Sequence, residues 1–452
     1  MITDEKILII GAGISGIGAA RLLEEAGAAP VLYDANEKLD RKVLESRLPG
    51  AAAGRIVLGA MPEELAEEAQ LVVLSPGVPV DSPLVERLRA HGAKVWSEVE
   101  LAWRFGKGRV AAITGTNGKT TTTALTGEIL KTYYEDVFVV GNIGESYTAH
   151  ALEMTENCAV AAEISSFQLE AVEEFRPDVS AILNITPDHL NRHHTMECYI
   201  RTKEMITKNQ GPAETCVLNY EDEVLRDFGR SLDTKVVYFS SARVLDEGVC
   251  LDGADIIFNE GGQRTKLCSV DELKLLGRHN YENVMAAAAV TRAMGVPFEN
   301  ISRAVKNFTA VEHRIEFVAE KQGVAWYNDS KGTNTDASIK AVEAMVRPTV
   351  LIGGGYDKQA EFDGFIEAFG DKVKELVLIG ETAAQIAQTA KRHGFENIIF
   401  ADGLKEAVGV CARDAKAGDA VLLSPACASW DMFDNYEQRG RLFKQYVQEL
   451  PD

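Results

Sequence analysis

The sequence predicts an α/β protein of three domains, and two features of the chain predict it. Short apolar runs alternate with longer amphipathic segments along almost the whole sequence, a pattern typical of parallel sheets wrapped by helices. A length of 452 residues, at roughly 150 residues per domain, corresponds to about three domains. We expect a Rossmann-like N-terminal domain, a central P-loop ATPase-like domain with a mostly parallel sheet, and a Rossmann-like C-terminal domain.

The N-terminal region contains the first series of predicted strands. They are Lys6–Ile10, Val31–Tyr33 and Leu71–Leu74, and helical stretches such as Ile17–Ala26 separate them. A third, later series has a helix-like segment after each strand. Its strands are Val324–Tyr327, Val350–Ile352, Leu376–Ile379, Ile398–Phe400 and Ala420–Leu423. Boundaries near residues 96 and 310 divide the chain into domains 1–96, 97–310 and 311–452.

Between these two series, the central region begins near Arg109. Its predicted strands are Val110–Ile113, Val137–Val140, Ala159–Ile164 and Val179–Ile185. The stretch Val236–Leu273 is less regular, and its glycines indicate an antiparallel side sheet. An alanine-rich helix, Met285–Ala293, follows, with Asn280 or Asn283 as its predicted N-cap.

The composition limits the classes of partner. Lysine and arginine total 47 against 68 aspartates and glutamates, a net charge of -21, which repels nucleic acid and anionic lipid. No apolar stretch approaches the roughly 18 residues needed to cross a membrane. The 7 cysteines are odd in number and scattered, which indicates reduced thiols and a cytoplasmic protein.

Gly11–Gly16 reads G-x-G-x-x-G between a strand and a helix, and Asp34 ends the next strand. In a dinucleotide-binding fingerprint the glycines let the backbone approach a diphosphate at a helix N-terminus, while the acid bonds a hydroxyl or an imide. A second turn, Ser75–Val78, follows another strand of the same domain. A tight turn without a ligand is the alternative, and the motif does not determine the nucleotide.

Gly115–Thr121, with the sequence Gly-Thr-Asn-Gly-Lys-Thr-Thr, is the most specific motif of the chain. It lies between a strand and a helix, so its backbone N–H groups and Lys119 can cradle phosphates while Thr120 offers a hydroxyl to Mg²⁺. The loop is shorter than a usual P-loop, because Ile113 stands where the first glycine is expected.

Two side chains follow neighbouring strands and are candidates for metal ligands. Glu163 ends an apolar strand, and His189 comes after the next one. Because ligands of doubly wound sheets bind at the carboxyl ends of strands, we expect both to converge with Thr120 on a divalent metal. A hydrogen-bonded loop residue is the alternative interpretation of His189.

Polar or glycine-rich loops follow several later strands. Asn328–Asn334 concentrates polar side chains, with a solvated turn as the alternative, and Gly353–Lys358 and Ser424–Ser429 each close a strand. We expect Ser429 directly ahead of a helix over Trp430–Tyr446, where a helix N-terminus suits a carboxylate.

As a set, these motifs resemble the Mur ligase family of peptidoglycan synthesis across nearly the whole chain. The segments that carry the resemblance are Gly115–Thr121, Gly141–Gly144, Glu163–Glu170, His279–Asn283, Asp329–Lys331 and Ser424–Ser429. The resemblance implies that the first domain binds UDP rather than NAD, the second ATP and the third an amino acid. No Asp-Asn-Pro-Arg stretch of the diamino-acid-adding members is present, which favours D-glutamate.

The resemblance implies an ATP-dependent ligase that adds D-glutamate to UDP-N-acetylmuramoyl-L-alanine through an acyl phosphate and releases ADP and phosphate. Mg²⁺ is the implied metal, and the small-molecule substrates are the implied partners of a monomer. Activation brings a carboxylate to a polyanion, and each pair of unit charges costs about 4 kcal/mol at about 4 Å and a dielectric of about 20. Lys119 and Mg²⁺ would offset that repulsion.

The resemblance also implies roles for individual residues. The ATP-binding residues are Gly115, Thr116, Asn117, Gly118, Lys119, Thr120, Thr121, Asn283, Arg314 and Asp329. The catalytic residues are Lys119, Glu163, His189 and Lys203, and the metal-binding residues are Thr120, Glu163, His189 and Lys203. The UDP-sugar would contact Ile14, Ser15, Asp34, Ser75, Gly77 and Asn142. D-glutamate would contact Thr333, Lys358, Ser429 and Tyr436, while the role of Asp357 stays open.

Lys203 matches the lysine that the family carbamylates. Carbamylation needs a neutral amine, and burial beside other cations can lower the pKa of a lysine by as much as roughly 3 to 5 units from about 10.4. We therefore expect Lys203 to be buried near a second positive charge.

Three other functions remain open. Another amino-acid-adding ligase of the same superfamily, including its folylpolyglutamate synthetase relatives, would share most of the motifs. An NAD-dependent dehydrogenase would explain Gly11–Asp34 but gives Lys119, Glu163 and His189 no role. An ATP-dependent binding protein without catalysis leaves the loops of the third domain unexplained.

Overall fold

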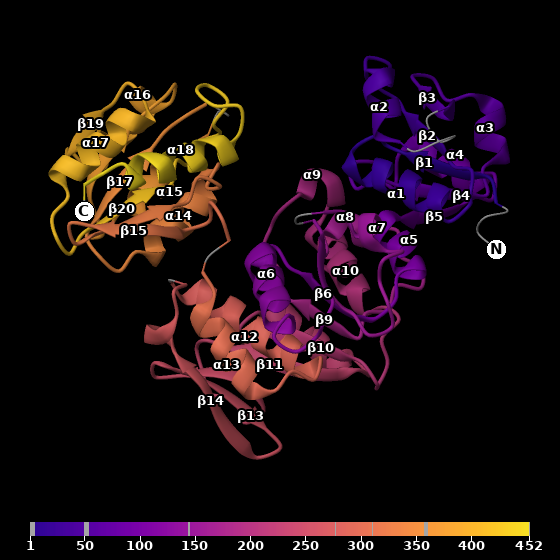
Figure 1. The fold of residues 1–452 in the computed structure, drawn as a ribbon, viewed down its shortest axis with the longest axis horizontal. Coiled ribbons are helices and arrows are strands. Elements are labelled where there is room, and N and C mark those ends of the chain that lie inside the picture. Colours follow the sequence, from indigo (N-terminus) through magenta and orange to yellow (C-terminus); the bar gives the residue numbers. More distant parts are fainter. Residues whose placement is uncertain are drawn as a thin grey trace. The chain divides into compact units, whose positions relative to one another are not determined.

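The structure is a computed structural model that describes residues 5–48, 54–142, 145–275, 277–309, 311–356 and 360–451. The chain divides into two compact units: Met1–Val270 with Glu282–Val305, and Asp271–Tyr281 with Lys306–Asp452. The first unit contains two β-sheets and the second contains one, and helices cover each sheet (Figure 1). The predicted α/β class with mostly parallel sheets is confirmed, while the boundaries near residues 96 and 310 remain predictions.

The first sheet has the strand order β3-β2-β1-β4-β5, and all its pairings are parallel. Its strands are β1 (Ile7–Ile10), β2 (Val31–Asp34), β3 (Ile56–Leu58), β4 (Leu71–Leu74) and β5 (Lys94–Ser97). Its helices are α1 (Ile14–Glu25), α2 (Arg41–Arg47), α3 (Glu63–Glu68), α4 (Pro83–Ala90) and α5 (Glu98–Phe105). The strand order reverses between β1 and β4, so the turns after these strands lie at the switch point where such folds bind ligands.

The glycine turn after β1 depends on one close approach. A Cβ atom at Gly16 would lie 1.8 Å from the carbonyl oxygen of Gly11, so a larger residue would displace the start of α1.

The second sheet has nine strands in the order β14-β13-β12-β11-β10-β9-β6-β8-β7. They are β6 (Arg109–Thr114), β7 (Val137–Gly141), β8 (Ala159–Glu163), β9 (Val179–Ile182), β10 (Thr215–Asn219), β11 (Lys235–Ser240), β12 (Gly248–Asp252), β13 (Asp255–Glu260) and β14 (Gln263–Ser269). Associated helices are α6 (Lys119–Leu130), α7 (Tyr147–His150), α8 (Ser166–Leu169), α9 (Leu190–His193), α10 (Met196–Glu204), α11 (Glu223–Ser231), α12 (Arg278–Ala293) and α13 (Phe298–Asn307).

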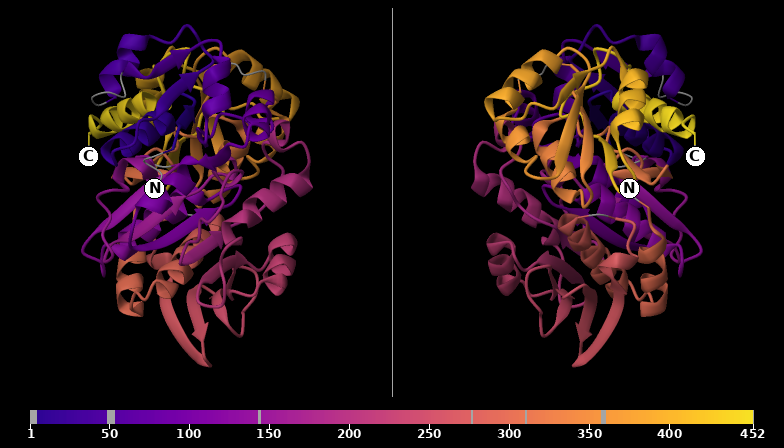
Figure 2. Two further views of the ribbon diagram at one scale, coloured as in Figure 1. Left: turned by 90° about the vertical axis from the view of Figure 1, so that its right-hand side faces the viewer. Right: turned by 90° about the vertical axis from the view of Figure 1, so that its left-hand side faces the viewer.

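The predicted side sheet is an extension of this sheet rather than a separate one. Strand β12 pairs with β11 in parallel, and only the β12–β13 and β13–β14 pairs are antiparallel. The hairpin of β13 and β14 forms the lower tip of both views in Figure 2. Its outer strand, β14, carries Arg264 and Lys266, which form ion pairs with Asp252 and Asp255.

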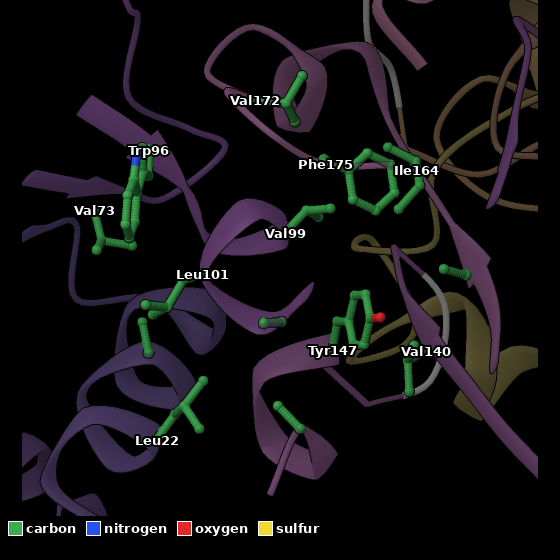
Figure 3. Packing of buried hydrophobic residues seen from close by; sticks show 14 of the residues in the cluster. Leu22, Val73, Trp96, Val99, Leu101, Val140, Tyr147, Ile164, Val172 and Phe175 are labelled. Atoms are coloured by element: carbon green, nitrogen blue, oxygen red, sulfur yellow. The ribbon is translucent and has the colours of Figure 1, made fainter. Parts of the chain in front are cut away.

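One continuous core joins the two sheets of the first unit. Trp96, Val99 and Leu101, from β5 and α5, pack in the same cluster as Leu22 of α1 and Tyr147 of α7 (Figure 3). Each large apolar side chain buried in this way contributes roughly 1.5–3 kcal/mol. Helix α5 is therefore fixed between the glycine turn and the second sheet.

The third sheet, in the second unit, has the order β15-β16-β20-β17-β18-β19. Its strands are β15 (Glu316–Lys321), β16 (Val324–Asn328), β17 (Thr349–Gly353), β18 (Val373–Leu378), β19 (Ile398–Phe400) and β20 (Ala420–Leu423), and its helices are α14 (Thr335–Ala344), α15 (Asp363–Glu367), α16 (Ala383–Arg392), α17 (Leu404–Asp414) and α18 (Tyr436–Gln448). The β15–β16 pair is antiparallel and the other pairs are parallel.

Two predicted helix starts are wrong. Helix α12 begins at Arg278, so Asn280 and Asn283 lie inside it and do not cap it. The last helix begins at Tyr436, because the side chain of Asn435 accepts the backbone N–H of Gln438 and ends the preceding turn there.

Within the described part of the chain, no helix is both long and apolar enough to cross a membrane. No disulfide forms among its cysteines, as predicted.

Candidate active site

The phosphate-type loop follows β6, between the carboxyl ends of β8 and β9. The backbone N–H of Asn117 donates to Asn184 Oδ1 (2.8 Å), which fixes the loop to the segment after β9. Gly118 has φ +86, and a Cβ there would lie 2.3 Å from Asn283 Oδ1. The same Asn283 oxygen accepts from Thr122 Oγ1 (3.2 Å), so α12 supports the loop from behind.

Two lysines share one backbone acceptor in this loop. Lys119 Nζ donates to the carbonyls of Gly115 (2.8 Å) and Thr116 (2.9 Å), and Lys203 Nζ donates to the same Gly115 carbonyl (2.8 Å). Lys203 is 1% exposed. Burial, and secondarily the charge of Lys119, lowers the pKa of Lys203 to about 7. The expected burial of Lys203 near a second cation is present.

Tyr199 and the segment after β9 hold the two lysines in place. Lys203 Nζ lies 4.8 Å from the ring centre of Tyr199, whose hydroxyl is 3.0 Å from Thr116 Oγ1. The N–H of Thr186 also donates to Thr116 Oγ1 (3.0 Å). These supporting residues were not among the predicted site residues, because their role depends on contacts between distant parts of the sequence.

Glu163 is buried at the end of β8, beside β6, and pairs in register with Ile113. Its Oε1 accepts from Asn142 Nδ2 (3.0 Å). Its Oε2 is buried and has no hydrogen-bond partner among the described residues. A buried carboxylate oxygen without a donor is costly in the absence of a ligand, so this atom is suited to a cation.

His189 is half-exposed and lies in the left-handed region, at φ 51. Its ring centre is 4.9 Å from that of Phe167, which follows Glu163 in the turn into α8. The neighbouring His193 is different: it is buried, its Nε2 is 2.9 Å from Ser166 Oγ, and burial lowers its pKa to about 4. His189 is therefore the accessible histidine of this pair.

Among the described residues, no three His, Cys, Asp or Glu side chains gather closely enough to form a metal cage. This does not match a zinc-like site, but Mg²⁺ commonly takes only one or two carboxylates and completes its shell with water and substrate phosphates. Glu163, with its unpartnered oxygen, and Thr120, at the head of α6, fit that pattern.

The predicted UDP-sugar residues of the first sheet lie on the turns after β1, β2 and β4. Asp34 Oδ2 accepts the N–H of Ala12 (2.8 Å), and Ser75 Oγ donates to the carbonyl of Gly11 (3.0 Å). Ile14 is 78% exposed, and Gly77 follows Ser75 in the turn after β4. Asn142 instead lies after β7, bonded to Glu163, and Ile143 and Gly144 lie outside the described residues.

In the second unit, Asp329 follows β16 and is buried. Its Oδ2 accepts from Ser424 Oγ (2.7 Å) and its Oδ1 from the N–H of Ile315 (3.2 Å). Burial raises the pKa of Asp329 to about 7, although Ser424 and Arg314 oppose that shift.

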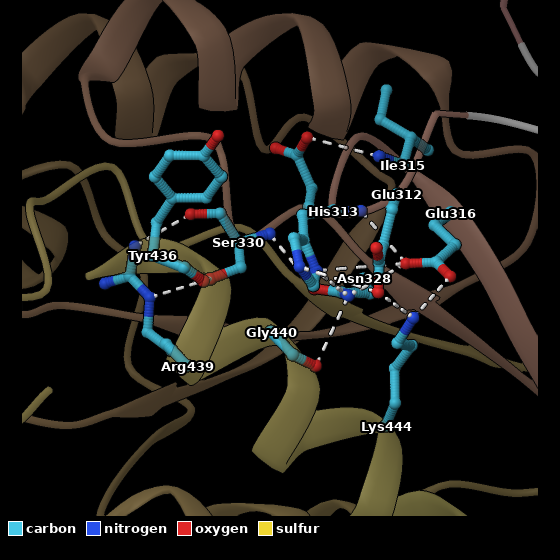
Figure 4. Close-up of polar contacts among 11 residues, drawn as sticks. Glu312, His313, Ile315, Glu316, Asn328, Ser330, Tyr436, Arg439, Gly440 and Lys444 are labelled. Atoms are coloured by element: carbon cyan, nitrogen blue, oxygen red, sulfur yellow. Dashed lines mark hydrogen bonds and ion pairs between the residues drawn. The ribbon is translucent and has the colours of Figure 1, made fainter. Parts of the chain in front are cut away.

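Arg439 of α18 is fully buried behind this loop (Figure 4). It donates to Ser330 Oγ (3.0 Å) and to the Ser330 carbonyl (2.8 Å), and also to the carbonyls of Cys427 (3.2 Å) and Ala428 (3.3 Å). Burial lowers the pKa of Arg439 to about 10, so it stays charged at neutral pH. This network binds the loops after β16 and β20 together, and sequence reasoning missed it.

The predicted D-glutamate residues occupy several loops of this unit. Thr333 lies ahead of α14, and Tyr436 begins α18, with burial raising its pKa to about 12. Ser429 is buried, but seven residues of turn and extended chain separate it from Tyr436, so the expected helix N-terminus at Ser429 is wrong. Lys358 and Asp357 lie outside the described residues.

A cavity of about 300 Å³ in this unit contains none of the predicted site residues. It is lined by Lys321, Gln322, Val324, Trp326, Ala412, Arg413, Ala415, Ala417, Leu450 and Pro451.

Family models match three consecutive parts of the chain. Residues 5–97 match the Mur ligase MurD-like N-terminal domain, residues 113–291 the Mur ligase middle domain, and residues 313–427 the Mur ligase glutamate ligase domain. A protein of Lachnospira eligens named UDP-N-acetylmuramoylalanine--D-glutamate ligase is 57% identical over 99% of both chains. The chain belongs to the Mur ligase family.

Further comparisons agree with this assignment. An Alkaliphilus metalliredigens protein of the same name is 46% identical to this Mur ligase, over 99% of this chain and 98% of its own. Two solved structures share the fold. The UDP-N-acetylmuramate-alanine ligase MurC of Thermotoga maritima has a TM-score of 0.60 at 20% identity, covering 98% of this chain and 99% of its own. The MurF ligase of that organism, in complex with ADP, has 0.57 at 18%, covering 93% and 95%.

Proposed function

We propose that this Mur ligase adds D-glutamate to UDP-N-acetylmuramoyl-L-alanine, using ATP and forming ADP and phosphate by way of an acyl phosphate. The observation that carries the proposal is the 57% identity, over 99% of both chains, to a relative named for that reaction. The arrangement of Lys119, Lys203 and Glu163 around the loop after β6 supports phosphoryl transfer as the first step.

In this proposal the loop Gly115–Thr121 binds the ATP phosphates. Its N–H groups and Lys119 approach the anionic oxygens, and Lys119 then exchanges a carbonyl acceptor for phosphate. Asn283 supports the loop through Thr122, and Arg314 and Asp329 of the second unit are proposed nucleotide contacts. Because a carbonyl is a weaker partner for an ammonium group than a phosphate, the exchange favours nucleotide binding.

Thr120, Glu163, His189 and Lys203 are the proposed metal-binding residues. Bound Mg²⁺ supplies positive charge that offsets repulsion between the substrate carboxylate and the phosphates. Glu163 offers its unpartnered Oε2, and Asn142 orients the carboxylate through Oε1. The exposed ring of His189 stays available for a second ligand position.

We also propose that Lys203 is carbamylated. Its amine is neutral in about half of the molecules near pH 7, given a pKa of about 7. The nitrogen lone pair adds to CO2, a proton is released, and the product is an anionic carbamate that no longer repels Mg²⁺. The anion would lie beside Lys119, which offsets the cost of burying it.

The substrates have separate proposed sites. The UDP-sugar contacts Ile14, Ser15, Asp34, Ser75, Gly77 and Asn142. Thr333, Lys358, Ser429 and Tyr436 bind D-glutamate, whose amine attacks the activated carbonyl carbon. A cytoplasmic location and a monomeric state are further predictions.

Phosphate release tests the function directly. Purified protein is mixed with ATP, Mg²⁺ and UDP-N-acetylmuramoyl-L-alanine, and the amino acid is varied among D-glutamate, L-glutamate, L-lysine and L-alanine. Phosphate release should require both the nucleotide sugar and D-glutamate, and mass spectrometry should find the amide product. Equal release with L-lysine or L-alanine would support another ligase of the superfamily, and release without amide would contradict ligation.

A further inference from the structure

Glu98, the first residue of α5, is a buried carboxyl group with an unusual set of partners. It is 2% exposed. Its Oε1 accepts from Gln168 Nε2 (2.8 Å) and from Ser15 Oγ (3.4 Å), while its Oε2 is buried without a partner among the described residues. A half-satisfied carboxyl group in a core lowers stability, so packing alone does not explain it.

The two partners of Glu98 lie on different loops of the proposed site. Ser15 is in the first turn of α1, directly after the glycine turn. Gln168 belongs to the capping box of α8, where its Oε1 accepts from the N–H (2.7 Å) and the hydroxyl (2.9 Å) of Ser165. Ser165 is two residues beyond Glu163. A continuous hydrogen-bonded path therefore runs from the glycine turn to the strand that ends in Glu163.

A second glutamate on the same helix shows what a purely structural role looks like. Glu100 is fully buried and accepts the backbone N–H groups of Glu173, Glu174 and Phe175, and Arg104 bonds it as well. Both of its oxygens are satisfied. Glu98 differs because its partners are side chains of two ligand loops, and because burial raises its pKa to about 7.

We propose that Glu98 is a positioning residue that couples the nucleotide-sugar loop to the metal-binding turn by holding Ser15 and Gln168 on one oxygen. The inference rests on the proposed function. When Ser15 is fixed by the UDP-sugar, Glu98 and Gln168 are fixed with it, and the turn that follows Glu163 is ordered. Neither Glu98 nor Gln168 needs to touch a substrate for this.

The test compares three variants of the full-length protein. Glu98→Ala removes the shared acceptor and should raise the KM for UDP-N-acetylmuramoyl-L-alanine about tenfold, with the KM for D-glutamate within about twofold of the unaltered protein. Glu98→Gln keeps one oxygen that can accept both bonds, so it should restore the KM to within about twofold. Glu375→Ala is the matched control. Glu375 is also buried with an unpartnered oxygen, but it lies on β18 of the second unit, so the KM should not change.

A double-mutant cycle provides a second measurement that does not require Glu98→Ala to fold. Ser15→Ala and Gln168→Leu remove side chains that share no direct bond, so independent effects on kcat/KM for the nucleotide sugar would multiply. Coupling through Glu98 predicts that the double variant loses about threefold or more less than that product.

The outcomes separate the two proposals. A protein that releases no phosphate with the nucleotide sugar and D-glutamate contradicts the proposed function. An active protein with an unchanged KM in folded Glu98→Ala, with a Gln variant that fails to restore the KM, or with a multiplicative cycle overturns the role of Glu98.

Discussion

Two buried cations, one in each unit, show opposite solutions to the same problem. Arg439 places its guanidinium against a hydroxyl and several carbonyls and keeps a pKa of about 10. Lys203 has, among the described residues, one hydrogen bond, to the Gly115 carbonyl, and a pKa of about 7. The first cation is fully solvated by protein and stays charged. The second is not, and burial favours its neutral form.

The difference separates stabilising groups from reactive groups. A guanidinium that satisfies its donors links two loops and has no free lone pair. An amine that is partly neutral has a lone pair available for addition to CO2. The same contrast holds between Asp329, whose two oxygens are both bonded, and Glu163, whose Oε2 has no partner in the described structure.

The largest expected effect would break the comparison at Lys203. Lys203→Met should lower kcat by about 10²–10³-fold, a loss of about 3–4 kcal/mol in the barrier, because the proposed metal ligand is removed. The free energy of unfolding should stay equal or rise, since a poorly solvated buried amine is replaced by an apolar side chain. Steady-state kinetics and urea unfolding measure both. Lys208→Met, an exposed lysine nearby, is the control, and wild-type kcat in Lys203→Met would refute the reactive role.

The reverse result is expected at Arg439. Arg439→Met leaves the carbonyls of Ser330 and Cys427 without donors, at about 1–3 kcal/mol for each buried group. We expect the second unit to lose about 3 kcal/mol or more, seen as a lower urea midpoint. Arg413→Met removes an exposed arginine and should cost less than about 0.5 kcal/mol. Similar midpoints for the two variants would remove the structural half of the comparison.

Gly118→Ala sharpens the comparison by deforming the loop that holds Lys203. The left-handed backbone alone costs about 1–2 kcal/mol, and the new Cβ would also press on Asn283. The KM for ATP should rise as well. Gly92→Ala places the same strain where nothing lies within 4 Å, so it isolates the backbone cost. If the two variants match in stability and in KM, the contact with Asn283 has no consequence.

The smallest effect is a pH dependence. With a pKa of about 7, the neutral fraction of Lys203 rises about fivefold between pH 6 and pH 7, while Arg439 stays charged. The initial rate of carbamate formation should rise with it at constant CO2 pressure, followed by the ¹³C signal of labelled CO2. A Lys203→Met sample should lack the signal. A rate independent of pH would mean that the amine titrates elsewhere.

The phosphate loop and Glu163 can be predicted from the sequence because their signals are local. Glycines, a lysine and a helix start lie within Gly115–Thr121, and Glu163 ends a run of apolar residues. The start of the last helix cannot be read in the same way. Trp430–Phe433 continues the apolar pattern of that helix, but the side chain of Asn435 competes for the backbone and sets the boundary.

Glu98 and Arg439 show where sequence reasoning ends. Glu98 reads as an ordinary acid in the first turn of a helix, which is favourable even when exposed. Its burial follows from the packing of α5 against α8, and that packing joins residues 70 positions apart. Arg439 likewise bonds to Ser330, 109 positions away. No local pattern distinguishes either residue from a surface charge.

The charged hairpin of β13 and β14 has a consequence for how the molecule behaves in concentrated solution. An outer strand offers unpaired backbone groups that can recruit a strand from a neighbouring molecule. Arg264 and Lys266 stand on that rim, and each is matched to an aspartate of its own chain. Stacking a second copy there would strip water from four charges, so self-association into fibres is disfavoured by the rim itself.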